Sequence, residues 1–239
     1  MTHPLSRRIA DVLGLAPDAQ ALEYEGRWLS WAALGGLADQ IGSVVGDGTE
    51  PPQVGILLRN RPAHVATLLG VLQRGATVVA INPARGDERI KADVNQLGLP
   101  LIIGEPDDLA TLDKSPATTV VSISGFAAEP KVIAAEAPSR VAAARPGVAV
   151  RMLTSGTTGP PKRVDLTYDM LAHSVMGPRY ERAPAPTELR RGVAIVNSPL
   201  VHIGGVFRIL QCVAEARPFV LLERFDLNRW AEAVRTYRP

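Results

Sequence analysis

The residues most able to do chemistry stand together in one nine-residue run that follows a predicted buried strand. The run occupies residues 154–162 and reads Thr-Ser-Gly-Thr-Thr-Gly-Pro-Pro-Lys. Glycines let a backbone wrap closely around a phosphate, and exposed N–H groups and hydroxyls can donate hydrogen bonds to its oxygens. Lys162 would add a compact positive charge for a developing pyrophosphate. The run therefore predicts a phosphate-binding loop. We expect the loop to lie at a strand-to-helix turn, where the N-terminus of the following helix would also favour an anion.

Two other interpretations of this run follow from its composition. A cluster of Ser, Thr and Gly is also typical of a flexible surface loop, and most such clusters are no more than that. A Walker loop is excluded, because that motif needs Gly-x4-Gly-Lys-Ser/Thr and here two prolines separate Gly159 from Lys162. Arg163 follows the lysine, so an ordinary P-loop kinase is not indicated.

Other residues that could do chemistry have weaker support. His202 stands in the sequence Pro-Leu-Val-His-Ile-Gly-Gly, and without such a setting a lone histidine is more often structural than catalytic. Asp165 and Asp169 suggest a magnesium site less strongly than they suggest favourable charges at a helix N-terminus. Cys212 is expected to be a buried apolar residue rather than a reactive thiol. His64 and His173 are expected to be structural or exposed.

Composition narrows the class of protein. The chain has 239 residues, 46% of them hydrophobic, so it can bury one large core or two modest ones. Its formal charge of +2 comes from arginines that are interleaved with acids, which argues against a nucleic-acid surface. One cysteine and four dispersed histidines leave no zinc-binding spacing. No signal peptide and no run of about 18 apolar residues is present, so a cytoplasmic protein without a transmembrane segment is expected.

Short β-branched runs alternate with segments of helical periodicity, a pattern that predicts an α/β fold with a mostly parallel sheet flanked by helices. A hairpin is predicted over residues 21–29. Further strands are predicted over residues 54–58, 77–81, 101–103, 119–123, 148–153, 193–197 and 219–222. Helices are predicted over residues 30–45, 62–74, 88–97, 167–175, 206–216 and 227–237.

Three segments follow from this order of elements. Residues 1–177 are predicted to hold the N-terminal hairpin and helix and a first wound α/β subdomain that contains the phosphate loop. The polar, proline-rich stretch 178–191 is a connection. Residues 192–239 contain the opening elements of a second, incomplete sheet. We expect that sheet to leave the apolar faces of helices 206–216 and 227–237 uncovered, which would favour association, for example as a homodimer.

The run at 154–162 resembles, at every position, the signature loop of adenylate-forming enzymes. This superfamily contains acyl-CoA synthetases, luciferases and the adenylation domains of peptide synthetases. Segments 24–34, 69–83, 198–205 and 223–226 are similar to further segments of the same family, in the same order. The resemblance covers nearly the whole chain from about residue 21 and corresponds to the N-terminal portion of these enzymes.

The resemblance implies an ATP-dependent carboxylic acid:CoA ligase. In this family the loop holds the phosphates of ATP while a carboxylate attacks the α-phosphorus, and a thiol of CoA or phosphopantetheine then displaces AMP. ATP, Mg²⁺ and CoA are the cofactors implied, and a small carboxylic acid, fatty or aryl, is the substrate. His202 and Lys162 become the catalytic candidates. The ATP-binding candidates are Thr154, Ser155, Gly156, Thr157, Thr158, Gly159 and Lys162.

Some features depart from the family pattern. Arg163 stands where the family usually has glycine, and the sequence does not decide between a phosphate contact and crowding of the loop. The adenine-binding segment, the ribose-binding aspartate and the C-terminal domain with its catalytic lysine are not found in the chain. We therefore expect this chain alone to be inactive. A nucleotide- or acyl-binding module without turnover, or a structural domain with an inert loop, are the alternatives.

Overall fold

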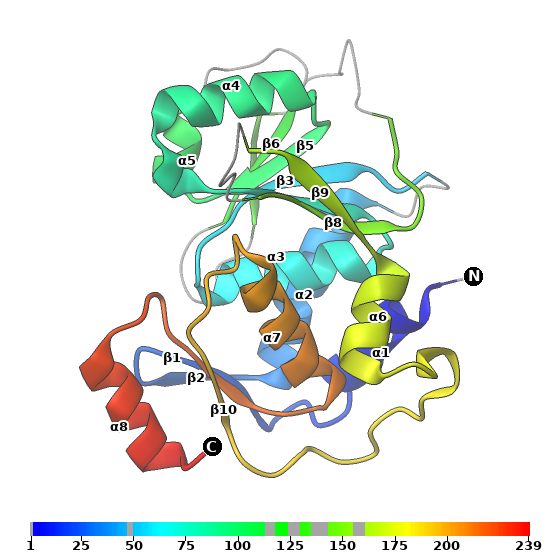
Figure 1. The fold of residues 1–239 in the computed structure, drawn as a ribbon, viewed down its shortest axis with the longest axis vertical. Helices are drawn as coiled ribbons and strands as arrows, with labels where there is room; N and C mark the ends of the chain where they lie inside the picture. The colour runs from blue at the N-terminus through cyan, green and yellow to red at the C-terminus, as the bar shows by residue number, and fades with distance from the viewer. Residues whose placement is uncertain (1, 47–49, 113–117, 124–129, 135–142, 155–160) are drawn as a thin grey trace.

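The computed structural model describes residues 2–46, 50–112, 118–123, 130–134, 143–154 and 161–239. Its elements form two sheets that are separated by a layer of helices, with further helices on the outer face of each sheet (Figure 1). The prediction of an α/β fold with mostly parallel sheets is confirmed. None of the described helices is both long enough and apolar enough to cross a membrane.

The larger sheet has the strand order β7-β6-β5-β3-β4-β8-β9. The five central strands run parallel, and β7 and β9 are antiparallel at the two edges. The strands are β3 (Gln53–Leu57), β4 (Thr77–Ile81), β5 (Leu101–Gly104), β6 (Thr119–Ser122), β7 (Lys131–Ala134), β8 (Val148–Leu153) and β9 (Arg163–Thr167). Both β3 and β4 are buried along their whole length, because helices cover both faces of a central parallel strand.

Side chains that alternate along the strands build a separate core on each face of this sheet. Ile56 and Val78 point to the inner face and join the main core of the protein. Leu57, Val79 and Ile81 point to the outer face, where they join a smaller core. Helices α4 (Asp87–Leu97) and α5 (Pro106–Ala110) cover that smaller core.

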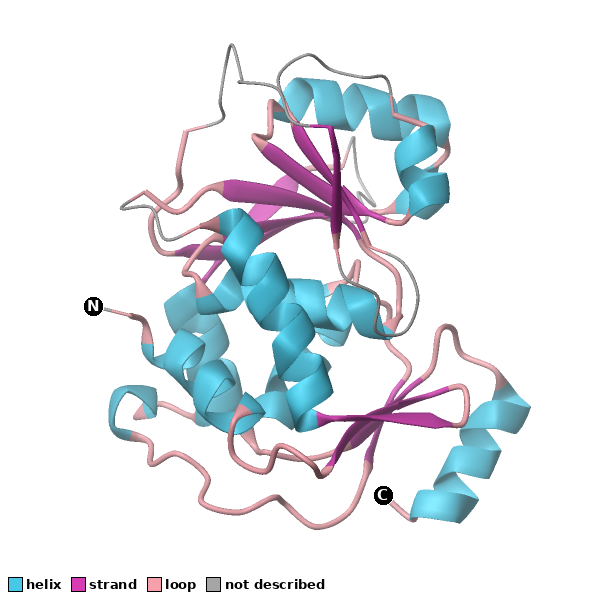
Figure 2. Cartoon of the chain, turned by 180° about the vertical axis from the view of Figure 1, so that it is seen from behind, coloured by secondary structure: helices cyan, strands magenta, loops and turns pink. Residues whose placement is uncertain are grey.

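The layer between the sheets contains the most deeply buried helices (Figures 1 and 2). These are α1 (Pro4–Leu13), α2 (Trp31–Val45), α3 (Pro62–Gln73), α6 (Tyr168–Met176) and α7 (Ile203–Ala214). Helices α2 and α3 approach so closely that a Cβ atom on Gly70 would lie 2.3 Å from the carbonyl oxygen of Ala38. Helix α1 was not predicted; it begins at Pro4, and His3 Nδ1 caps it by accepting a hydrogen bond from the Leu5 N–H.

The smaller sheet joins the two ends of the chain. Its order is β10 (Ala194–Val196), β11 (Phe219–Leu221), β1 (Gln20–Tyr24) and β2 (Arg27–Ser30). Strand β1 pairs in parallel with β11, with Leu22 opposite Phe219. The hairpin that the sequence analysis grouped with residues 1–177 thus pairs with strands of the segment 192–239. Helix α8 (Leu227–Tyr237) packs on the outer face of this sheet through Ala233.

The two C-terminal helices differ in how far they are covered. The apolar face of α7 is buried against α1 and α6, so the prediction that it lacks cover is wrong. Helix α8 buries only Ala233, and its Leu227 and Trp230 side chains are 65% and 38% exposed. Phe225, just before the helix, is 59% exposed. The expected tendency to associate therefore depends on α8 and the turn before it.

Candidate functional site

The predicted phosphate loop begins at the carboxyl edge of the larger sheet. Strands β3, β4 and β8 are parallel neighbours, so the segments that follow them emerge at one edge. These segments are residues 58–61 after β3, residues 82–85 after β4, and the loop that starts at Thr154 after β8. Ligands of open α/β sheets bind at this kind of edge.

The loop joins two antiparallel strands and does not lead into a helix. The Thr154 N–H donates to the carbonyl oxygen of Lys162 at 2.8 Å, and the Lys162 N–H donates to Thr154 Oγ1 at 3.3 Å. The side chains of Thr154 and Lys162 are exposed. The other predicted loop residues, Ser155, Gly156, Thr157, Thr158 and Gly159, lie outside the described residues.

The prediction of a strand-to-helix turn at this loop is therefore wrong. Strand β9 follows the loop and runs back along β8. Thr167 at the end of β9 therefore pairs with Val148 at the start of β8, a full strand length away from the loop. Helix α6 begins only there, with Thr167 Oγ1 as its cap. The positive end of α6 thus cannot contribute to anion binding at the loop, and backbone N–H groups, hydroxyls and Lys162 are the groups left to do so.

The described contacts of the Arg163 side chain lie outside the loop. Its guanidinium group donates to the carbonyl oxygen of Ala80 at 3.1 Å and forms an ion pair with Asp93 at 2.5 Å. The side chain is 10% exposed. Burial lowers the pKa of Arg163, although Asp93 partly compensates. The residue that replaces the usual glycine therefore ties the exit of the loop to β4 and α4.

His202 lies in a pocket at the same edge of the sheet. The pocket has a volume of about 820 Å³ and is lined by the segments after β3 and β4, the segment before α7 and the turn before α8. His202 is exposed and precedes the first residue of α7, without a side-chain capping bond. Asn60, Asn82, Glu223, Arg224 and Arg229 also line the pocket, so its described wall is largely polar.

Comparisons with known proteins identify the fold and the family. Residues 11–239 match the family described as AMP-binding enzyme. The chain belongs to this family. It is 27% identical over 227 residues to the medium/long-chain-fatty-acid–CoA ligase FadD17 of Mycobacterium marinum, a match that covers 91% of this chain and 43% of that ligase. Syringomycin synthase SyrB1 of Pseudomonas syringae pv. syringae is 30% identical over 154 residues, covering 64% and 24% of the two chains.

Solved structures of AMP-binding enzymes have the same fold as this chain. ATP-bound MatB from Rhodopseudomonas palustris superposes with a TM-score of 0.75 at 20% identity, and the match covers 99% of this chain and 48% of that one. The o-succinylbenzoate coenzyme A synthetase MenE from Bacillus subtilis, in complex with AMP, gives a TM-score of 0.70 at 21% identity. The chain spans less than half the length of FadD17 and of MatB.

Asn60 is a residue beside the pocket that the sequence did not single out. Its side-chain amide donates to the carbonyl oxygens of Ser198 and Leu222, at 3.0 and 3.1 Å, and its Oδ1 accepts from the Leu200 N–H at 2.8 Å. It is 4% exposed. Asn60 thus attaches the end of β3 to the segment that carries His202. A polar residue within three positions of the end of a buried strand was the available signal.

Arg61 continues this connection with charged partners. It forms ion pairs with Glu105 and with Glu223, the latter at 2.7 Å. The buried His64 ring lies 3.1 Å from Glu105, and the Tyr24 hydroxyl donates to Glu223 at 3.0 Å. Burial would raise the pKa of Glu105, but His64 and Arg61 outweigh it and hold the pKa below its usual value. The network joins both sheets beside the pocket.

The remaining candidates have structural roles. Asp165 lies on β9 and pairs with Arg145 and Arg151 at 2.6 and 2.8 Å, so it does not lie at a helix N-terminus. Asp169 does lie in the first turn of α6, as predicted. Cys212 is buried, as predicted, and burial raises its pKa to about 11, which disfavours a reactive thiolate.

Proposed function

We propose that this chain is the N-terminal part of an ATP-dependent carboxylic acid:CoA ligase. The reaction would join an acid to AMP with release of pyrophosphate and then form a thioester with CoA or a phosphopantetheine arm. The observation that carries the proposal is the hairpin loop that closes at Thr154 and Lys162, at the same sheet edge as the pocket of His202. Membership of the AMP-binding family supports ATP as the nucleotide.

Two described residues at the base of the loop support the proposal of a triphosphate there. Lys162 is exposed beside the loop base, where its ammonium group could offset charge on the β- and γ-phosphates. Thr154 adds a hydroxyl at the opposite side of the base. Among the described residues no group of three or more His, Cys, Asp and Glu side chains could hold a metal ion. Mg²⁺ therefore enters the proposal bound to the phosphates of ATP.

We propose His202 as the residue that faces the reacting carboxylate. It lies between the segment held by Asn60 and the first turn of α7, so its backbone position is well defined. The acid itself is proposed as fatty or aryl. The similarity to a ligase named for medium- and long-chain fatty acids supports the fatty class.

Adenylation by the 239-residue chain alone is not expected. Preorganised donors must surround the α-phosphate, and removal of one such donor can lower the rate about a hundredfold. The chain covers less than half of FadD17 and of MatB, and we propose that the contacts to adenine and ribose come from segments other than those described here. A nucleotide- or acyl-binding module without turnover is the second candidate.

Nucleotide binding to the chain tests the first part of the proposal. Lys162→Ala should weaken ATP binding, measured by calorimetry with Mg²⁺, by about tenfold or more, because a charge-assisted contact is lost. Lys131→Ala is the matched control, since Lys131 is also exposed and lies on β7 at the far edge of the same sheet. Equal affinities of the two variants would refute the role of Lys162.

Exchange of pyrophosphate into ATP separates the two candidates. The assay uses a panel of fatty and aryl acids with this chain and with a full-length protein that contains it. Exchange by the longer protein alone supports a ligase whose N-terminal part is described here. Exchange by neither, with ATP binding intact, supports the binding module. Robust exchange by the 239-residue chain would contradict the expected dependence on further segments.

A further inference from the structure

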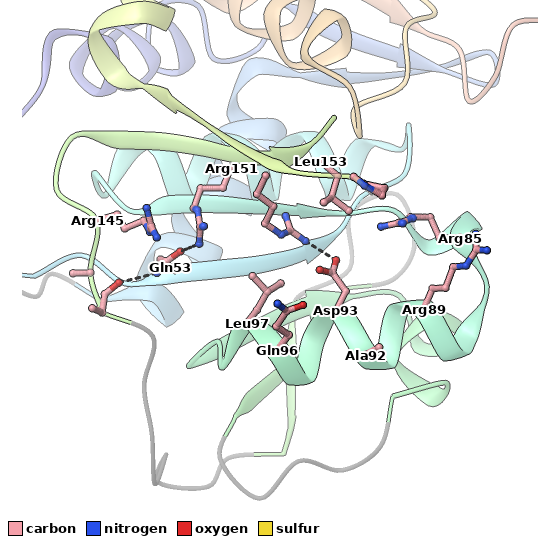
Figure 3. A pocket seen from close by; sticks show the side chains of 14 residues that line it. Gln53, Arg85, Arg89, Ala92, Asp93, Gln96, Leu97, Arg145, Arg151 and Leu153 are labelled. Carbon is pink, nitrogen blue, oxygen red and sulfur yellow. Dashed lines mark hydrogen bonds and ion pairs between the residues drawn. The ribbon is translucent and has the colours of Figure 1, made fainter. Parts of the chain in front are cut away.

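A second pocket, on the outer face of the larger sheet, is lined by arginines. It has a volume of about 1020 Å³ and lies between α4 and the β8–β9 hairpin (Figure 3). The arginines are Arg85, Arg89, Arg145, Arg151 and Arg163. The part of the outer face that α4 covers is apolar, with Leu57, Val79 and Ile81 in a packed core. The part between α4 and the β8–β9 hairpin carries charged side chains instead.

One face of α4 supplies a wall of this pocket. Arg89, Asp93 and Leu97 recur at four-residue spacing, which places them on one side of the helix. Arg85 precedes α4 in the turn η1 (Pro83–Arg85). Figure 3 shows Arg85 and Arg89 at one end of the pocket, with Gln53, Arg145 and Arg151 towards the other.

Three of the arginines are held by acids. Arg163 pairs with Asp93, and Arg145 and Arg151 share Asp165. Arg151 also donates to Gln53 Oε1 at 2.6 Å. These contacts keep three guanidinium groups in place on the β8–β9 side of the pocket. Of the two carboxylates in these ion pairs, Asp93 lines the pocket, and Asp165 lies behind Arg145 and Arg151 without lining it.

Arg85 and Arg89 differ from these three arginines in their contacts. Among the described residues, neither side chain has a hydrogen-bond or ion-pair partner. Asp87 and Glu88 lie in the same turn of α4, but neither lines the pocket, and Glu88 pairs with Lys91 at 3.6 Å. Burial is the main cause that lowers the pKa of Arg163, and the positive charges of Arg151 and Arg85 act in the same direction.

We propose that this arginine pocket binds a small ligand with two or more phosphate groups. Five guanidinium groups line the pocket and two carboxylates, Asp93 and Asp165, pair with three of them, which leaves three positive charges unbalanced among these described residues. Guanidinium groups bind phosphate oxygens in pairs of parallel hydrogen bonds, and a concave charged site focuses the field on such an anion. Arg85 and Arg89 provide the free donors, and the paired arginines provide the fixed field.

This site differs from the proposed ATP site in the residues that would bind phosphate. Lys162 does not line the arginine pocket, whereas its neighbours Pro161 and Arg163 do. Arg163 and Arg151 belong to the outer face of the hairpin, because Arg151 pairs in register with Asp165 and Leu153 with Arg163. The inner face of β8 contributes Val150 and Met152 to the main core instead.

The test measures binding of inorganic tripolyphosphate by calorimetry in the Lys162→Ala background, which removes the main charge of the loop. Arg85→Gln with Arg89→Gln should weaken the remaining binding at least about tenfold and reduce its dependence on salt. The matched control, Arg191→Gln with Arg235→Gln, removes the same charge from exposed arginines that do not line the pocket and should change the affinity less than about twofold. Equal melting temperatures would show that both double variants are folded.

Two results would overturn the proposal. One is a Lys162→Ala protein that no longer binds tripolyphosphate, and the other is an equal loss of affinity in the two double variants. Parallel titrations with ADP and with pyrophosphate distinguish a nucleotide ligand from an inorganic one. Tighter binding of ADP than of pyrophosphate would indicate a nucleotide, and equal binding of the two would indicate an inorganic polyphosphate. ATP binding by the protein with Lys162 intact is measured separately. A negative result for the arginine pocket therefore does not decide whether the proposed ATP site binds ATP.

Discussion

Two adjacent glycines at the start of α7 are expected to respond oppositely to substitution by alanine. A Cβ atom on Gly205 would lie 2.3 Å from the carbonyl oxygen of Pro199 and 2.8 Å from the Leu200 nitrogen. A Cβ atom on Gly204 would come no closer than 3.9 Å to its nearest neighbour, Ser198. Both glycines lie in the first turn of the same helix, so each serves as the control for the other.

The expected magnitudes follow from these distances. Alanine at Gly205 must push α7 away from a backbone segment that Asn60 holds with a buried hydrogen bond, so neither side can move freely. Overpacking of this kind typically costs about 1–3 kcal/mol, whereas replacing glycine in a helix gains at most about 1 kcal/mol. Gly205→Ala should therefore be destabilised by about 1–2 kcal/mol. Gly204→Ala should be unchanged or slightly more stable.

Thermal and urea unfolding of both variants measure this difference. For a protein of this size each kcal/mol corresponds to about 2–4 °C in Tm, so the two variants should differ by several degrees. Equal Tm values would show that α7 can shift away from the Pro199 carbonyl without cost. In that case the close approach of helix and segment does not determine the position of His202.

Two further predictions concern the polar groups beside the pocket. Asn60→Ala leaves two carbonyl oxygens and one N–H without their hydrogen-bond partner, and each buried group of this kind costs about 1–3 kcal/mol. Urea unfolding should therefore show a loss of several kcal/mol in the free energy of unfolding. The control Asn82→Ala, at a partly exposed residue, should show only a small loss. The pKa of Glu105 is lowered in the folded state, so its contribution is present above the unfolded pKa near 4.5 and is lost as pH falls through the folded value. Glu105→Gln should therefore destabilise the protein at pH 7 and less at pH 3, and a pH-independent difference in unfolding free energy would contradict the role of His64 and Arg61.

Much of the fold could be predicted because local patterns agree with tertiary structure. Strands β4 and β8 and helix α8 have the bounds that the sequence predicted. Continuous apolar runs indicate buried parallel strands, and regular spacing indicates helices that pack on one side. Helix α1 also carried a signal that was overlooked: Leu5, Ile9 and Val12 lie on one face and are buried.

The error at the phosphate loop has a different cause. Strand β9 is short, contains Arg163 and Asp165, and lies at the edge of the sheet with only β8 as neighbour. Charged residues are common on edge strands, because they discourage further pairing, and they obscure the apolar pattern of a strand. The alternation of Arg163, Asp165 and Thr167 with Val164 and Leu166 was nevertheless a period of two, which a helix would not show.

The connection between the two sheets could not be predicted, because it depends on contacts between residues far apart in the sequence. Asn60 and Arg61 are neighbours in the turn after β3, yet Asn60 bonds to Ser198 and Leu222, and Arg61 pairs with Glu223. Two adjacent side chains in the turn after β3 thus hold both the segment that leads to His202 and the end of β11. Since the phosphate loop emerges at the same edge of that sheet, this turn sets the position of the His202 pocket relative to the loop. A substitution there should change the geometry between the two proposed ligand sites even though neither residue belongs to the loop.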